Sequence, residues 1–594
     1  MKHYKTSLAL LAVLCVSAAA SAQIFMSGGI GYHVLSAENH TVEVTGKQNC
    51  TPYSGNINIP ATVTYNGTIY DVVALGEEAF YWATLSRVTI PSSVTHIKRG
   101  CFLFATVPTT INVSASVTNI EALAFAANHL TNINVDESNP NYRTIDGMLF
   151  SKDTATLVEC PMAKSGSVTL PQGTRHIASL AFAYCENITS VTLPESLVSI
   201  GYWAFVYNQH LNNVIIPSSV THIAASPFTN CPALTNLSID DGNTHYYMDG
   251  MMIYSAGGDT LVSAHKSADS VFLPSTLRVV NGFGGNSDVR YIHIPDGVNT
   301  IGREAFNGSS LVSIDLPSHM DFIDEYAFYY CQSLTRVGMP TTLDTMGEGC
   351  FHSCNQLTSI DIPDGLRVIP EDAFFMCNAL SHITWGNAVE IIDTCAFGDC
   401  SFTKLTLPPT LRVVRMTAFI GDYMGRLNRL TFSAPVDTIE VGAFYQQPLQ
   451  MLRLHNTVPP VTTDDGYGTY GCLNGTDVDS IFIPCGSLNA YLADDYWSQF
   501  ADQYYNDCDG IDEIEDSRMK IDIYPNPAST SLTIEGLEGA VRVELVDMNG
   551  RVTQASSHSN NHAITFDVSN YARGTYVLRL HSPDGVVTRK VILQ

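Results

Sequence analysis

The sequence predicts a right-handed solenoid of α/β type, dominated by β-structure and followed by a small C-terminal β-sandwich. Two observations predict the solenoid. An Ala-Phe pair recurs about every 23 residues, and a proline follows an apolar strand in the same phase. The third observation is a change of pattern after Asp516. From there the chain alternates short apolar strands with Gly, Asn and Pro turns, which is typical of a sandwich.

The repeat is most regular in the second half of the chain. From Phe306 onward the marker phenylalanines are 22, 23, 23, 23, 22 and 25 residues apart. Each unit contains an alternating segment such as Ile360-Asp361-Ile362, which predicts a short strand with one buried face. One unit cannot bury this face alone, so we expect stacked coils whose strands pair about 4.8 Å apart.

Two longer gaps between markers contain the same kind of insert. "NYRTIDGMLFSKDTATLVECP" follows Phe125, and "HYYMDGMMIYSAGGDTLVSAH" follows Phe228. Each insert has Asp-Gly followed by an apolar run, a turn and another apolar run, which is a hairpin pattern. We therefore expect extra hairpins that protrude from the stack near residues 136–168 and 240–271.

Charge and the N-terminal segment limit the classes of partner. Thirty basic and 57 acidic residues give a net charge of -27, which excludes nucleic acid as the expected ligand and disfavours anionic lipid. A basic start, an apolar run at Leu8–Val16 and a small-residue cleavage site before Gln23 predict a signal peptide at residues 1–22. No later segment has 18 uninterrupted apolar residues, so we expect no transmembrane span.

Six cysteines occupy one repeated position, three residues after the marker Phe. They are Cys185, Cys231, Cys331, Cys354, Cys377 and Cys400. In other units this position holds Asn, Ser or Ala, so it requires a short side chain and not a thiolate. The position therefore predicts a line of buried free thiols. A disulfide is expected among the later cysteines Cys472, Cys485 and Cys508 of an exported protein, with the pairing left open.

Motifs that carry catalytic chemistry are absent from the sequence. It contains no His-Glu-x-x-His, no Gly-x-Ser-x-Gly and no phosphate-binding Gly-Lys-Ser/Thr loop. Zinc sites need clustered pairs such as Cys-x-x-Cys, and these are also missing. "DCDGIDEIED" has its Gly510 at the wrong position for an EF-hand, so residues 506–518 are predicted to be an acidic linker. We expect no catalytic, cofactor or metal site.

The exposed positions of the strand ladder are the candidate site, because stacked coils make them one continuous surface. In the predicted register these positions include Thr89, Asn134, Thr169, Thr192, Ile215, Ser238, Phe272, His293, Asp315, Asp361, Thr384, Thr406, Thr431 and Arg453. The candidate binding strip consists of Thr192, Ile215, His293, Asp315, Asp361, Thr384, Thr406 and Arg453. Small hydroxylated residues with apolar or charged exceptions suit contact with a protein or a glycan. The alternative is that the threonines are present only because threonine favours β-strands, and not because they bind a ligand.

The repeat unit resembles the leucine-rich repeats of the BspA-like type. "YSGNINIPATVTYNGTIYDVVALGEEAF" looks like the N-terminal cap of that family, and "IFIPCGSLNAYLADDYWSQF" looks like its C-terminal cap. Caps are required because terminal coils would otherwise expose apolar edges. On this basis we expect an N-terminal cap at residues 23–56 and the leucine-rich repeat solenoid at residues 57–505.

The last 76 residues, 519–594, resemble the type A sorting domain of the type IX secretion system of Bacteroidetes. The blocks "YPNP", "DMNGR", "ARGTYVLRL" and "RKVILQ" appear in order. The motif residues are Tyr524, Pro525, Asn526, Pro527, Gly550, Gly574, Tyr576 and Lys590. The resemblance implies the secretion machinery as a partner, export across the outer membrane, and either attachment to surface lipopolysaccharide or release.

Together these resemblances imply an adhesin that recognises host matrix proteins or other bacteria. A structural protein of the envelope or biofilm, without a specific ligand, is the alternative. An enzyme is the third hypothesis, and we do not expect it because no catalytic domain fits in the remaining chain.

Overall fold

The structure is a computed structural model, and it describes most of the chain. The described residues are 24–47, 51–265, 268–421, 425–463, 471–473, 475–476, 478–507, 522–524, 528–535, 542–547, 551–557, 563–582 and 585–593. The predicted signal peptide lies outside them, as does residue 508 onward of the predicted linker. The chain divides into two compact units, Met1–Ile481 and Phe482–Gln594.

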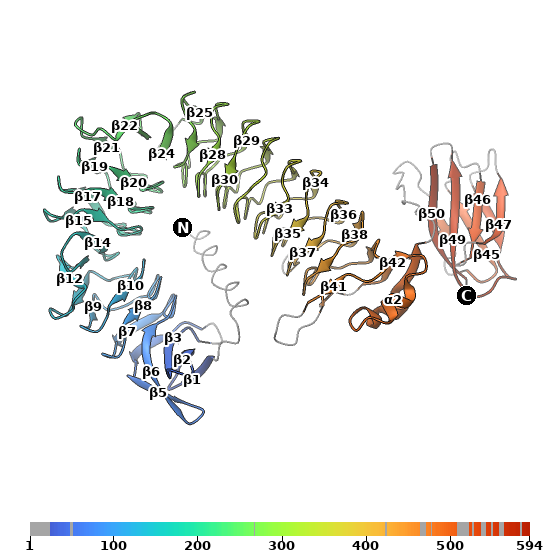
Figure 1. Cartoon of the computed structure of the whole chain (residues 1–594), viewed down its shortest axis with the longest axis horizontal. Coiled ribbons are helices and arrows are strands. Elements are labelled where there is room, and N and C mark those ends of the chain that lie inside the picture. Colours follow the sequence, from blue (N-terminus) through green and yellow to red (C-terminus); the bar gives the residue numbers. More distant parts are fainter. Residues whose placement is uncertain are drawn as a thin grey trace. The chain divides into compact units, whose positions relative to one another are not determined.

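The first unit is a β-solenoid, as the repeat predicts. Each regular coil contributes one two-residue strand and one longer strand, and within each sheet these strands pair in parallel with their counterparts in neighbouring coils (Figure 1). Helix is almost absent from the described residues. Its two pieces, α2 (Leu488–Leu492) and the 3-10 turn η1 (Trp497–Gln503), both lie in the second unit. The expected β-dominated solenoid is therefore confirmed.

The two-residue strands form four successive sheets, three of which begin with longer strands. The first holds β1 (Ile24–Ser27), β2 (Ile30–Ser36), β3 (Thr41–Thr45), β5 (Thr62–Tyr65), β6 (Thr68–Leu75), β8 (His96–Ile97) and β10 (Asn119–Ile120). The second holds β12 (Tyr142–Ile145), β13 (Met148–Ser151), β14 (Thr156–Glu159), β16 (His176–Ile177), β18 (Ser199–Ile200) and β20 (His222–Ile223). The third holds β22 (Tyr246–Asp249), β23 (Met252–Ser255), β24 (Thr260–Ala264), β26 (Val279–Val280), β28 (Thr300–Ile301) and β30 (Phe322–Ile323). The fourth holds β33 (Val368–Ile369), β35 (Ile391–Ile392), β37 (Val413–Val414), β39 (Thr438–Ile439) and β41 (Val461–Thr462).

The longer strands form a second ladder, which carries the candidate binding strip. It begins with the pairs β4 (Ser54–Asn58) with β7 (Thr84–Thr89) and β9 (Thr110–Val113) with β11 (Asn132–Val135). Two four-stranded sheets follow: β15 (Gly166–Thr169), β17 (Ile188–Thr192), β19 (Asn213–Ile216), β21 (Asn236–Ile239), and then β25 (Ser270–Phe272), β27 (Tyr291–His293), β29 (Ser313–Asp315), β31 (Arg336–Gly338). The last groups in this unit are β32 (Ser359–Asp361) with β34 (His382–Thr384), and β36 (Lys404–Leu407) with β38 (Arg429–Phe432) and β40 (Met451–Arg453).

The two inserts are not simply hairpins that protrude from the stack. Each is a three-stranded antiparallel meander, and its third strand joins the ladder, because β14 pairs in parallel with β16 and β24 with β26. The N-terminal strands β1, β2 and β3 begin the first sheet in the same way, since β3 pairs in parallel with β6. The expectation of a protruding hairpin is corrected accordingly. The third apolar run of each insert supplies an edge that the next coil can pair with.

Stacked phenylalanines fill the interior of the coils. From Phe283 to Phe444 eight marker rings lie one above another, with neighbouring ring centroids 5.1–5.5 Å apart. Their planes are nearly parallel, and each ring is buried. This separation is close to the spacing of paired strands, so one ring per coil stacks in register along the core.

Each coil also turns sharply on both sides of its marker phenylalanine. In most coils the residues two before and two after the marker have positive φ, for example Asp372 (55°) and Met376 (58°) around Phe374. Most of these positions hold ordinary L-residues instead of glycine, which costs about 1–2 kcal/mol at each. The conformation persists because the surrounding packed coils fix it.

The second unit contains a short segment followed by two antiparallel sheets. β42 (Ser480–Pro484) spans the boundary between the units, and β43 (Tyr504–Asp507) follows it. The two sheets are formed by β44 (Asp522–Tyr524), β45 (Ser531–Glu535) and β48 (Ala563–Asp567), and by β46 (Arg542–Val546), β47 (Val552–Ser557), β49 (Gly574–Ser582) and β50 (Gly585–Leu593). Buried residues from both sheets, including Leu532 and Leu578, belong to one apolar cluster.

Candidate functional site

The longer strands of the solenoid present a row of side chains away from the core. Alternation along each strand buries the central residue and exposes its neighbours, as in β29, where Ile314 is buried and Asp315 exposed. Parallel pairing then aligns equivalent positions, so that Phe272 lies opposite His293 and His293 opposite Asp315. Of the positions predicted to be exposed, Thr89, Thr431 and Arg453 are half-buried and the others are exposed.

The candidate binding strip is divided into groups. Its members are exposed except Arg453, which is half-buried. His293 and Asp315 are direct neighbours, Asp361 and Thr384 are direct neighbours, and Thr192 and Ile215 lie on the adjacent strands β17 and β19. In the last group, Thr431 stands in register between Thr406 and Arg453. The ladder of longer strands is interrupted between β21 and β25, between β31 and β32 and between β34 and β36, so the strip is a series of patches.

One strip residue has a partner that sequence reasoning missed. Asp315 accepts a hydrogen bond from Arg336 of the next coil, with 2.7 Å between Oδ2 and Nη2. This contact raises the pKa of the Arg336 guanidinium, chiefly through the hydrogen bond itself. Both side chains are exposed, so the pair contributes at most about 1 kcal/mol to stability. Opposite charges about one repeat apart were the available signal.

Aromatic side chains also gather on this ladder. Phe272 is 81% exposed, and its ring centroid is 5.9 Å from that of His293. Tyr291 is 48% exposed and begins the same strand as His293. Sequence reasoning placed Phe272 on the surface but missed Tyr291, because only one of the two exposed positions of each strand was considered. Contiguous exposed apolar patches on a protein surface mark interaction sites.

The repeated cysteines belong to the core. Cys377 Sγ donates to the Phe351 carbonyl oxygen at 3.1 Å, and Cys354 makes the same contact with Phe328 at 3.1 Å. The asparagine of another unit, Asn208, donates to the Phe182 carbonyl oxygen at 2.8 Å in the same way. Burial raises the pKa of the Cys377 thiol to about 12. All six cysteines of this position are free and buried, which confirms the predicted line of thiols.

Replacement of Cys377 tests this structural role. We expect Cys377→Ala to lower the free energy of unfolding by about 1 kcal/mol, because the Phe351 carbonyl oxygen loses one of its two donors and keeps only the Cys354 N–H. Cys377→Ser keeps a donor and should cost less. Urea unfolding gives the stability, and native-state labelling with a thiol reagent should be slow for the wild type. Rapid labelling of folded protein at Cys377 would contradict the assignment.

The cysteines outside the repeated position differ from one another. Cys472 is a buried thiol, whereas Cys485 is disulfide-bonded. Cys508 lies outside the described residues. Among the residues that the structure describes, no group of three or more His, Cys, Asp or Glu side chains is placed to hold a metal ion.

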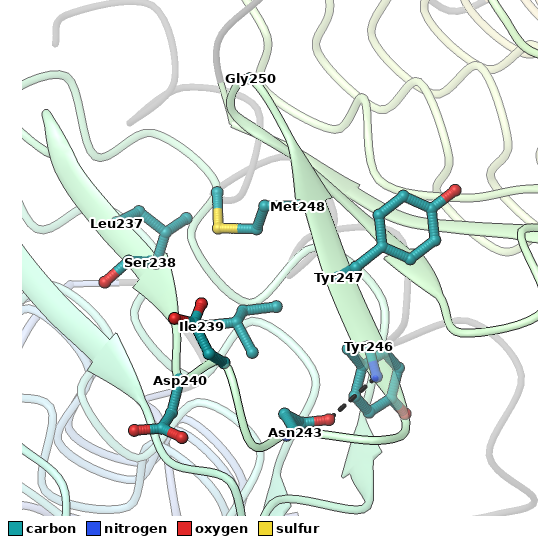
Figure 2. A pocket seen from close by; sticks show the side chains of 10 residues that line it. Leu237, Ser238, Ile239, Asp240, Asn243, Tyr246, Tyr247, Met248 and Gly250 are labelled. Atoms are coloured by element: carbon teal, nitrogen blue, oxygen red, sulfur yellow. Dashed lines mark hydrogen bonds between the residues drawn. The ribbon is translucent and has the colours of Figure 1, made fainter.

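A pocket of about 370 Å³ opens beside the second insert (Figure 2). It lies between β21 and the first insert strand β22, and Ile239 and Met248 are among its lining residues. Sequence reasoning did not anticipate this pocket, because the two inserts have the same sequence pattern.

Comparison with known families identifies the repeat. Residues 73–165, 158–252, 264–381 and 345–464 match the family model of the BspA type leucine rich repeat region, and these ranges cover more than half of the chain. The chain belongs to the BspA-type leucine-rich repeat family. Residues 522–594 match the secretion system C-terminal sorting domain, which confirms the resemblance to the type IX tail. This BspA-type protein is therefore exported, to the cell surface or beyond it.

The structure describes only part of the sorting motif. Pro525, Asn526, Pro527 and Gly550 lie outside the described residues, while Tyr524 is in β44 and Lys590 in β50. Gly574 begins β49 with φ of 147°, in the region that favours glycine. Tyr576 is buried, and its hydroxyl donates to the Ala572 carbonyl oxygen at 3.0 Å.

Solved structures of bacterial repeat proteins are similar to the BspA-type chain. A leucine-rich repeat protein from Eubacterium ventriosum has 20% identity and a TM-score of 0.37, and the match covers 66% of this chain and 93% of that one. A leucine rich cell surface protein from Faecalibacterium prausnitzii has 22% identity and a TM-score of 0.34, with 70% and 96% covered. A leucine-rich repeat protein from Bacteroides ovatus has 20% identity and a TM-score of 0.33, with 74% and 100% covered.

No curated protein matches the chain. No helix in the described part of the BspA-type chain is long and apolar enough to cross a membrane.

Proposed function

We propose that this BspA-type protein is an adhesin that binds protein or glycan ligands on host matrix or on other bacteria. In this proposal the type IX machinery exports the chain, which is then attached to surface lipopolysaccharide or released. The candidate binding strip and the aromatic residues beside it make the contact, and the chain acts by binding and not by catalysis. Two observations support the proposal: the chain is an exported repeat protein, and its strip exposes both apolar and polar side chains.

The observation that carries the proposal is the exposed apolar set on the longer-strand ladder. Phe272, Ile215 and Tyr291 are 81%, 54% and 48% exposed on a surface of otherwise polar side chains. Burying such rings on a partner supplies most of the affinity at interfaces, where a few aromatic anchors dominate.

The polar neighbours of these rings support specificity. His293 stands between Phe272 and Asp315 in the register, and Asp315 is paired with Arg336. A ring next to a carboxylate–guanidinium pair offers an apolar face together with donors and acceptors. That combination suits a sugar ring or a protein surface with an apolar centre and a polar rim.

Substitutions on the strip test the proposal. We expect the chain to bind immobilised matrix proteins or whole bacterial cells saturably. Phe272→Ala should weaken this binding by about tenfold, because truncating a central aromatic anchor removes one to several kcal/mol. A combined Asp315→Ala, Asp361→Ala and Arg453→Ala variant tests the polar part. Biolayer interferometry against matrix proteins and cell-binding assays give the affinities.

Val461→Ala provides the control, since Val461 is 62% exposed but lies on β41 of the other ladder. It should leave binding unchanged. The adhesin proposal fails if no matrix protein or bacterial cell is bound saturably. It also fails if both strip variants bind as well as the wild type. An altered envelope in a deletion strain with normal adhesion would favour the structural alternative.

A further inference from the structure

The two inserts of the solenoid differ in whether they form hydrogen bonds to the edge of the neighbouring strand. β11 comes before the first insert and β21 before the second, and in the described structure each is the last strand of its sheet. The backbone N–H groups of Asn236, at the start of β21, and of Asp240, just after it, donate to the preceding coil. Because neighbouring residues of a strand face opposite sides, the backbone groups of Leu237 and Ile239 point outward. The outer edge of each strand therefore faces its insert.

The first insert closes this edge with hydrogen bonds. The Ile133 N–H donates to the Gly147 carbonyl oxygen at 2.9 Å, and the Val135 N–H donates to Thr144 Oγ1 at 2.8 Å. The Thr144 hydroxyl in turn donates to the Ile133 carbonyl oxygen at 2.6 Å. The hairpin turn lies tightly against the strand, since a Cβ on Gly147 would stand 2.8 Å from the Thr131 carbonyl oxygen.

The second insert leaves the equivalent edge open. Met248 takes the place of Thr144, as the third residue of the first insert strand, and a thioether cannot donate a hydrogen bond. No described residue accepts from the outward N–H of Leu237 or Ile239. The turn also differs, because the residue equivalent to Gly147 is Met251, whose carbonyl oxygen accepts from the His265 N–H at 3.1 Å and not from β21.

The pocket of about 370 Å³ occupies this space. Figure 2 shows β21 and β22 on opposite sides of it, with Met248 directed between them. The pocket is lined by Leu237, Ser238, Ile239, Asp240, Asp241, Asn243, Tyr246, Tyr247, Met248 and Gly250. It therefore combines a free strand edge with apolar walls and with two exposed carboxylates after the carboxyl end of β21.

We propose that the open edge of β21 binds an extended peptide segment, which adds to the sheet as a further strand and carries a Lys or Arg near Asp240 and Asp241. A peptide backbone offers the donors and acceptors that Leu237 and Ile239 need, at strand spacing. The first insert shows that this edge can be closed by an oxygen acceptor and a donor at the same positions. The carboxylates favour a cationic residue over an acidic one.

The test uses the full chain and the acetylated, amidated peptide KVTVTVK, which has a lysine at each end so that both strand directions are possible. Isothermal titration calorimetry should show saturable one-to-one binding. A peptide with N-methylated valines should bind at least about tenfold more weakly, because the methyl groups remove the backbone donors. The neutral peptide QVTVTVQ should also bind more weakly, and the difference should shrink in high salt.

Matched variants of the protein locate the site. Met248→Thr restores the closing hydroxyl of the first insert and should abolish peptide binding, with thermal unfolding used to confirm folding. Thr144→Met opens the edge of β11 and should add a second binding event if that variant folds. Equal binding by wild type and folded Met248→Thr would overturn the proposal. So would equal binding of the N-methylated peptide, or binding of simple sugars at this pocket in place of peptides.

This proposal does not depend on the candidate binding strip. Phe272→Ala and the Asp315, Asp361 and Arg453 substitutions leave the β21 edge intact, and Met248→Thr leaves the strip intact. If the strip variants lose cell binding but still bind the peptide, adhesion through the strip and peptide binding at the β21 edge are separate functions.

Discussion

Replacing Phe374 by alanine is expected to lower the free energy of unfolding by about 3–5 kcal/mol. The ring is fully buried and stacks between Phe351 and Phe397, with centroid separations of 5.5 and 5.2 Å. Its removal leaves a cavity that two neighbouring coils share and cannot easily close. Because coils contact chiefly their neighbours, the damage should concentrate around β33 and β35. Urea unfolding and amide hydrogen exchange of these coils provide the measurements.

Phe272→Ala is the matched control for this prediction. It makes the same chemical change at a side chain that is 81% exposed, and it should alter stability by no more than about 0.5 kcal/mol. Equal stability losses in the two variants would contradict the assignment of the marker phenylalanines to the core. So would unchanged hydrogen exchange in the coils around Phe374.

The second large effect concerns Glu159, a buried carboxyl group at the end of β14. Its two oxygens accept from the Phe125 N–H at 3.1 and 3.2 Å. In regular coils this N–H donates to a carbonyl oxygen of the next coil, as Phe102 does to Ala124 at 3.0 Å. The Glu159 carboxyl therefore replaces the carbonyl acceptor that the next regular coil would supply, at the point where the first insert interrupts the repeat. Burial raises the pKa of Glu159 from 4.5 to about 8.

This raised pKa predicts the pH dependence of stability. Between pH 4.5 and about 8 the folded chain keeps a proton that the unfolded chain has released. The folded state then binds more protons, so the free energy of unfolding falls as the pH rises through this window. The stability that protonated Glu159 allows is fully present below pH 4.5 and is lost once the pH rises above about 8. We expect Glu159→Gln, which keeps an acceptor for Phe125, to gain roughly 3–5 kcal/mol over the wild type at pH 8.5.

The comparison should be made as a difference between variant and wild type from pH 5 to 8.5, so that other titrating groups cancel. Thermal unfolding monitored by circular dichroism gives the stabilities. Glu137→Gln, at an exposed carboxyl in the same insert, should produce no such difference. An unchanged pH slope in Glu159→Gln would show that the carboxyl is ionised when buried.

The sequence was informative wherever the repeat itself imposes the structure. The spacing of Cys354, Cys377 and Cys400 predicted buried thiols, because one position repeated in every coil must have one environment. The same argument placed Asp315 and Asp361 on the exposed side of their strands. These inferences needed only the period and the alternation of apolar residues, and the structure agrees with both.

Departures from the repeat were harder to predict. Sequence reasoning identified both inserts as hairpin patterns but did not recognise that their third strands continue the ladder. It also could not predict that Thr144 closes a strand edge and that Met248 leaves one open, because the hydroxyl matters only when a strand edge lies beside it. The pairing of Asp315 with Arg336 and the role of Glu159 toward Phe125 likewise depend on which coils become neighbours.

The sequence by itself determined the coil period, the core and surface positions, the family and the exported class of this protein. It did so because stacking forces every unit to bury the same positions. Only the tertiary structure decided where the ladders are interrupted, which strand edges the inserts close, and where the open edge at Leu237 and Ile239 lies. Hydrogen-bond satisfaction at an edge depends on the geometry of segments that meet only after folding, and no local pattern in the chain encodes that geometry.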